Sequence, residues 1–142
     1  MSVGGAGWEH LEAGAEMGVH AWAPTRAGAF AQAALGVLAL IARPEEVEER
    51  EHREVRAQAD SPERLLVGWI NECLYVHEIE GFVVRRVEVD ACTEGVVHGF
   101  LHGEEIDADR HRLRAAVKAA TLRGVSVAES SGSHDVRVVV DR

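Results

Sequence analysis

The sequence predicts an α+β fold in which two helices pack on a mixed, mostly antiparallel β-sheet. Two segments in the first half of the chain carry apolar residues at helical spacing. The second half alternates apolar and polar residues with a period of two, which is typical of half-exposed strands. No repeat, linker or low-complexity tract divides the 142 residues. We therefore expect one domain over residues 8–142, preceded by a flexible, glycine-rich start over residues 1–7.

The first third of the chain predicts two short strands and then a helix. Residues 8–12 and 17–23 favour strands, with a small-residue turn at residues 13–16 that would present Glu16. Thr25 is a suitable helix cap, and the sequence Arg43–Pro44 ends the helix. The expected buried face consists of Ala27, Phe30, Ala34, Leu38 and Ile41.

A charged stretch and a second helix follow. Within residues 45–59, the second half hints at a strand, and the acidic run at residues 45–54 predicts a solvated face. Ser61 and Pro62 form a strong helix start, and Gly81 is a stop signal. The apolar face of this helix is predicted to comprise Leu66, Trp69, Ile70, Cys73, Leu74 and His77.

The remaining residues predict four strands. Their ranges are residues 83–89, 96–103, 117–128 and 136–140. A polar turn is expected at residues 107–111, and Ser130, Ser131 and Gly132 supply the last turn.

Composition excludes several classes of protein. The 24 acidic and 15 basic residues give a formal net charge of −9, which argues against a general nucleic-acid binder. The longest apolar stretch, residues 27–42, is too short and too weakly hydrophobic to span a membrane. The first seven residues lack the features of a signal peptide, and two isolated cysteines make no disulfide framework. These features predict a soluble, cytoplasmic protein.

Histidines are numerous, but their spacing does not indicate a metal site. His98 and His102 are four residues apart in a segment that alternates like a strand, where that spacing separates the two rings. Surface or supporting roles are the simpler interpretation of the eight histidines.

Lys118 is the only lysine, since the other 14 basic residues are arginines. It lies within residues 110–123, which contain five basic residues and no acid. One interpretation is a site that needs a compact ammonium group. The alternative is a solvated strand face that carries positive charge by chance.

Four segments together resemble the archease family. Residues 8–19 are similar to its opening, an aromatic residue leading to a His-Thr-Ala-Asp motif that stands here as Ala13–Gly14–Ala15–Glu16. Residues 66–75 are similar to its Leu-x-x-Trp-Leu-Asn-Glu-Leu-Leu-Tyr pattern, with Gly68 where relatives often carry an acid. Residues 117–121 and 136–142 resemble its Val-Lys-Ala-x-Thr segment and its closing strand.

The resemblance implies an archease-like domain that serves an RNA ligase without joining RNA itself. Archeases are thought to promote guanylylation and repeated turnover of the ligase that joins 3′-phosphate or 2′,3′-cyclic-phosphate ends to 5′-hydroxyl ends in tRNA splicing and RNA repair. The resemblance also implies a divalent-metal site. Its ligands would be Glu16 and Asp141, with a main-chain oxygen of Arg142, and Lys118 falls on a lysine linked to function.

The glutamate at position 16 bears on the metal, because its extra methylene displaces the carboxylate. Ca²⁺ tolerates such a displacement better than Mg²⁺, whose ligands lie at roughly 2.1 Å. Two other functions remain open. One is a chaperone-like or protein-binding module with an altered metal site, and the other is a metal-dependent phosphohydrolase that uses the same acids.

Overall fold

The computed structural model describes residues 5–13 and 16–142. Residues 1–4 of the predicted flexible start, and Gly14 and Ala15 of the predicted first turn, lie outside the described residues. The elements, in chain order, are β1 (Gly7–Ala13), β2 (Glu16–Ala23), α1 (Arg26–Leu38), the short 3₁₀ helix η1 (Pro44–Glu46), β3 (Glu51–Gln58), α2 (Pro62–Glu80), β4 (Phe82–Cys92), β5 (Val96–Glu105), β6 (Ala119–Ser130) and β7 (Ser133–Asp141).

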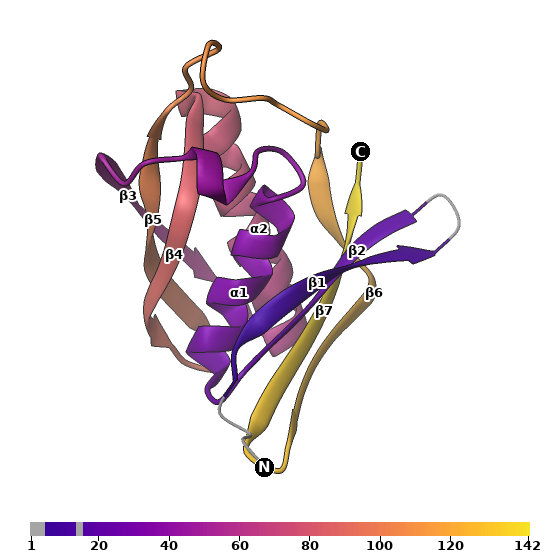
Figure 1. Ribbon diagram of the computed structural model, residues 1–142. Coiled ribbons are helices and arrows are strands. Elements are labelled where there is room, and N and C mark those ends of the chain that lie inside the picture. Colours follow the sequence, from indigo (N-terminus) through magenta and orange to yellow (C-terminus); the bar gives the residue numbers. More distant parts are fainter. Residues whose placement is uncertain (1–4, 14–15) are drawn as a thin grey trace.

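The strands form two sheets, and the two helices lie between them (Figure 1). One sheet has the order β1-β2-β7-β6 and the other has the order β3-β5-β4. Every pairing between the described strands is antiparallel. The structure confirms the predicted α+β class and its two helices, and adds the division of the strands into two layers.

Helix α1 is buried around most of its circumference, and this allows a sheet to pack on each side of it. Its buried residues are not confined to one face: Ala29, Phe30, Ala31, Ala33, Ala34, Gly36, Val37 and Leu38. Small side chains around most of the circumference allow β2 to approach from one side and β4 from the other. The periodicity in the sequence indicated that one face of this helix is buried. In the structure the small alanine and glycine residues allow a larger part of the helix surface to be buried.

The predicted starts of both helices and the predicted end of α2 are confirmed by capping contacts, whereas α1 ends at Leu38, before the stop expected at Arg43–Pro44. The Thr25 hydroxyl accepts a hydrogen bond from the Gly28 N–H at 3.0 Å, and the Ser61 hydroxyl accepts one from the Arg64 N–H at 3.2 Å. Gly81 ends α2 with φ +61°, a left-handed conformation that glycine adopts without strain. At the centre of the core, the indole N–H of Trp69 donates to the Phe30 carbonyl at 3.0 Å.

The strands match the predicted order, with differences at their ends. Strand β6, which was predicted over residues 117–128, starts at Ala119, so Val117 and Lys118 belong to the preceding loop. The predicted polar turn is present, where the N–H of His111 donates to the Asp107 carbonyl at 2.8 Å. Helix η1 was not predicted, because three residues carry no periodic signal. No helix within the described ranges is long and apolar enough to cross a membrane.

Candidate functional site

The candidate site lies where three strands of the four-stranded sheet end. Strand β7 is central, and its pairing places Met17 opposite Val140 and Ala119 opposite Asp141. Glu16 begins β2 rather than lying in a turn, so it stands beside the end of β7. The sheet thus brings the two predicted acids together, although they are far apart in the sequence.

An open cavity of about 480 Å³ occupies this end of the sheet. It is lined by all four residues predicted to carry function, together with one valine: Glu16, Lys118, Val140, Asp141 and Arg142. The structure therefore supports a common location for the two carboxylates, the only lysine and the main chain of Arg142.

Lys118 is held at the site by its backbone. Its N–H donates a hydrogen bond to the Asp141 carbonyl at 2.8 Å, just before β6 begins. Ala120, the second residue of β6, is fixed by two hydrogen bonds with a side chain of α2. The Asn71 side chain on α2 accepts from the Ala120 N–H at 2.7 Å and donates to the Ala120 carbonyl at 3.4 Å. Asn71 is thus a positioning residue that sequence analysis did not single out.

Arg123 is a second residue that the sequence did not place at the site. Its guanidinium forms an ion pair with the Glu16 carboxylate and lies 3.9 Å from Asp141 Oδ1. It belongs to an irregular stretch of β6, where the pairing with β7 shifts between Thr121 and Ser126. Gly124, with φ +75°, permits this irregularity. In the sequence, Gly124 was the signal that could have indicated an irregular strand next to Arg123.

The donor set can be compared with the requirements of a divalent cation. Carboxylate and main-chain oxygens are the ligands that Ca²⁺ and Mg²⁺ prefer. One cationic group, the Arg123 guanidinium, already reaches both Glu16 and Asp141, so a single cation can lie between them. The acidic side chains are 42% and 55% exposed, which leaves room for water as further ligands. The residues present therefore fit a solvated, oxygen-ligated metal ion.

Further ligands from side chains are not available nearby. Across residues 5–13 and 16–142, no group of three or more histidine, cysteine, aspartate or glutamate side chains is placed to hold a metal ion. Any ion at this site would depend on two carboxylates, main-chain oxygen and water.

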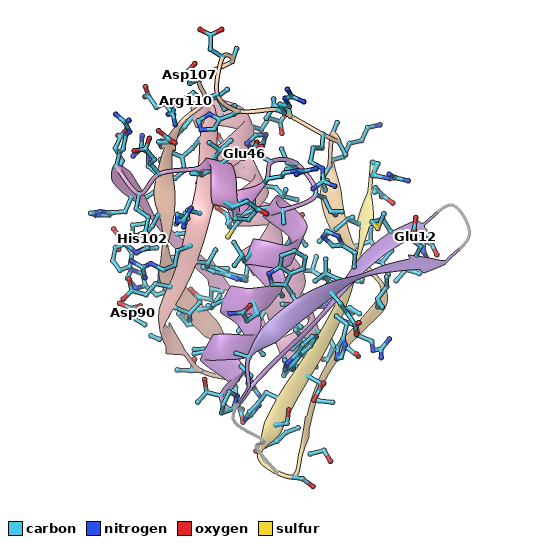
Figure 2. The ribbon with its side chains drawn as sticks, in the orientation of Figure 1. Glu12, Glu46, Asp90, His102, Asp107 and Arg110 are labelled. Atoms are coloured by element: carbon cyan, nitrogen blue, oxygen red, sulfur yellow. The ribbon has the colours of Figure 1, made fainter. Side chains whose placement is uncertain are left out.

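The basic segment at residues 110–123 does not form one continuous positive patch. Arg110 lies in ion pairs with Glu48, Glu104 and Asp107, and Figure 2 shows Arg110 and Asp107 together in the turn beyond β5. Arg123 is paired at the candidate site instead. The two ends of the segment are thus neutralised by different partners.

The histidines of β5 face carboxylates across the three-stranded sheet. His98 contacts Glu54 at 2.5 Å and Asp90 at 2.6 Å, and these hydrogen bonds raise its pKa. His102 contacts Glu88 at 2.9 Å, and Figure 2 shows His102 and Asp90 on this outer sheet. As predicted, His98 and His102 lie on a strand, and the ring of each makes a hydrogen bond with a carboxylate on this sheet.

Known proteins share both the sequence and the architecture of this chain. Residues 8–141 match the family described as "Archease protein family (MTH1598/TM1083)". A protein archease of Methanopyrus kandleri is 33% identical over 137 residues, which cover 94% of this chain and 98% of the relative. A protein archease of Pyrococcus abyssi is 30% identical over 123 residues, or 84% and 87% of the two chains.

A solved structure agrees with these sequence matches. The solution structure of Methanobacterium thermoautotrophicum protein 1598 superimposes with a TM-score of 0.80 at 28% identity, covering 96% of this chain and 99% of the other. The match over nearly the whole length confirms the resemblance found in the sequence motifs. The chain belongs to the archease protein family.

Proposed function

We propose that this protein is an accessory factor, not an enzyme, that promotes guanylylation and repeated turnover of an RNA ligase. The ligase would join 3′-phosphate or 2′,3′-cyclic-phosphate ends to 5′-hydroxyl ends in the cytoplasm. The observation that carries the proposal is the meeting of Glu16, Asp141 and Lys118 in one open cavity at the end of the four-stranded sheet. Family membership supports the same role.

The chemistry of the cavity suits a phosphate group held next to a cation. Glu16 and Asp141 would hold a divalent ion, with a main-chain oxygen of Arg142 as a further ligand. A bound ion would offset negative charge on nucleotide phosphates. Lys118 lines the same cavity, and its ammonium group would stabilise phosphate charge that develops during guanylylation of the partner.

Exposure of the acids favours Ca²⁺ over Mg²⁺ in this site. Both side chains are partly open to solvent, and neither carboxylate oxygen accepts a hydrogen bond from a main-chain N–H in the described structure. Such loosely held ligands adapt to the variable coordination of Ca²⁺ better than to the strict octahedron of Mg²⁺.

A protein-binding module without metal is the second candidate, and Arg123 is the observation that favours it. The guanidinium neutralises part of the carboxylate charge in the absence of any ion. If that ion pair is permanent, the cavity would serve only to shape a surface for the partner. A phosphohydrolase has no comparable support, because no histidine is among the described residues that line the cavity.

Multiple-turnover ligation with the cognate ligase tests the proposal. We expect the protein to raise the number of joined RNA ends per ligase molecule, and Lys118→Ala to abolish that stimulation. Arg112→Ala is the matched control, because Arg112 is an exposed basic residue of the same loop that does not line the cavity. Unchanged turnover with the wild-type protein would contradict the proposal. RNA binding by the isolated protein is expected to be weak.

A further inference from the structure

A second open cavity, of about 470 Å³, lies at the C-terminal end of α1. The beginning of β1, the segment around η1, strand β4 and the loop before β6 each contribute residues to its wall. The residues that matter for its chemistry are Trp8, Leu35, Arg43, Glu45, Arg85 and Arg114. Its volume is within the range of small-molecule sites.

Arg85 reaches this cavity because of a bulge in β4. The pairing of β4 with β5 shifts between Val84 and Arg86, which leaves Arg85 without a partner across the ladder. A bulge redirects the side chain of the extra residue. The Arg85 guanidinium donates to the main-chain carbonyls of Pro44 at 3.3 Å and Val47 at 3.1 Å, so it is fixed at the cavity wall by neutral acceptors.

Arg114 is fixed in a similar way from the opposite side. Its main-chain N–H donates to the Ile41 carbonyl at 2.7 Å, and its guanidinium donates to the Ala39 carbonyl at 3.4 Å. Ala39 caps the C-terminus of α1, where the helix dipole is negative. Arg114 therefore covers a carbonyl oxygen at this end of the helix, which would otherwise repel an anion.

The three guanidiniums carry charge that no direct ion pair neutralises within the described residues. Within the described ranges, Arg43, Arg85 and Arg114 form no ion pair with a carboxylate, whereas arginines such as Arg53 and Arg86 do. Among the described residues of the wall, Glu45 is the one acid, so three positive charges face one negative charge. In a chain with a net charge of −9, this concentration of positive charge is a local exception.

The rest of the wall is apolar and includes an aromatic ring. Trp8 is half-buried, and Leu35 and Pro44 extend the apolar surface beside it. Guanidinium groups bind phosphate oxygens in a bidentate manner, and an indole face accepts a planar base by stacking. We propose that this cavity binds a nucleoside phosphate, with Arg43 and Arg85 on the phosphate and Trp8 against the base.

This site is distinct from the carboxylate cavity and does not depend on the proposed function. In the β1–β2 hairpin, Trp8 pairs with Ala21, whereas Glu16 pairs with Ala13 at the other end. Loss of one site should leave the other intact, so the two proposals can fail separately.

Isothermal titration calorimetry of the full chain tests the inference, with GMP, AMP and inorganic pyrophosphate as the three probes and no metal present. We expect one binding site per chain for a nucleotide, with an affinity at least about tenfold higher than for pyrophosphate, because the base adds stacking on Trp8. The affinity should fall as salt increases, since the binding depends on exposed charges.

Variants connect the binding to this cavity. Arg43→Gln should weaken nucleotide binding about tenfold and Arg43→Gln/Arg85→Gln should abolish it, because each removes a cationic donor. Arg43 is exposed, and within the described chain its one hydrogen bond is made by its main-chain carbonyl, which accepts from the Glu46 N–H at 3.1 Å. Substitution of its side chain should therefore leave folding unchanged, which circular dichroism and thermal melting can verify. Arg112→Gln is the control. Absence of binding to the wild type, equal affinity for pyrophosphate, or binding that Arg43→Gln leaves unchanged would overturn the inference.

Discussion

The main-chain N–H of Lys118 lies 2.8 Å from the carbonyl oxygen of Asp141 and donates a hydrogen bond to it. This contact extends the pairing of β6 with β7 by one residue beyond Ala119 and Asp141. The position of Lys118 therefore depends on the backbone and not on its side chain. Substitutions of Lys118 should leave the sheet intact and report on the ammonium group alone.

Asp141→Asn should weaken Ca²⁺ binding at the carboxylate cavity by at least about tenfold. The substitution keeps the size of the side chain but removes one of two charged ligands, and charge count is a main determinant of Ca²⁺ affinity. Isothermal titration with Ca²⁺ measures the change. Asp109→Asn is the matched control, because Asp109 is an exposed aspartate of the loop after β5 and does not line the cavity. Equal affinities of Asp141→Asn and the wild type would contradict the assigned ligand.

Arg123→Gln should have the opposite effect and raise the Ca²⁺ affinity by up to about fivefold. In the structure the Arg123 guanidinium pairs with Glu16 and lies near Asp141, so a metal ion must displace it. The guanidinium is 66% exposed, and exposed ion pairs contribute only about 0.2–1 kcal/mol, which limits the expected gain. The same calcium titration measures it. An unchanged or lower affinity would show that Arg123 does not compete with the ion.

Local signals made the helices predictable, whereas the site depends on contacts between distant segments. Thr25, Ser61 and Gly81 define helix ends through neighbours within four or five residues, so their roles are visible in the sequence. Glu16 and Asp141 meet only because β2 pairs with β7, and spacing alone contains no trace of that pairing. The resemblance to archease sequences supplied those two residues.

The contact of Arg123 with the two acids could not be predicted from periodicity or from the family resemblance. The Arg123 side chain reaches the acids from an irregular stretch of β6, where the pairing with β7 shifts between Thr121 and Ser126. The separation of the strands into two sheets has a similar origin. It follows from burial around most of α1, which becomes apparent only when both sheets are in place.

Gly103→Ala should destabilise the fold by about 3 kcal/mol or more. An added Cβ would lie 1.9 Å from the Val83 carbonyl oxygen on the adjacent strand, which requires the backbone of β4 to move. Gly68→Ala is the matched control on α2, where the nearest atom to the new Cβ is 3.9 Å away. That helical substitution should raise stability by about 0.5–1 kcal/mol. Urea unfolding measures both, and similar stabilities of the two variants would contradict the packing described for β4 and β5.

Glu104 should make a large contribution to stability that disappears in acid. Its carboxylate is buried, and burial alone would raise its pKa, but hydrogen bonds from Arg110 at 2.5 Å, the Glu48 N–H at 2.7 Å and His111 at 3.0 Å outweigh burial and lower the pKa to about 2. Because the folded-state pKa is below the unfolded value near 4.5, the stabilisation is complete above about pH 4.5 and is lost as the pH falls towards 2. The difference in pKa corresponds to about 3 kcal/mol.

Glu104→Gln isolates this contribution, because it keeps the shape of the side chain and removes its charge. Near neutral pH the variant should be less stable than the wild type by about 3 kcal/mol, since Arg110 and His111 lose a buried anionic partner. The gap should narrow steadily between about pH 4.5 and pH 2, where the wild-type carboxylate becomes protonated. Urea unfolding at several pH values measures the gap, with Glu105→Gln, an exposed neighbour on β5, as the control. A gap that stays constant across this range would show that packing of the carboxyl group, and not its charge, stabilises the turn beyond β5.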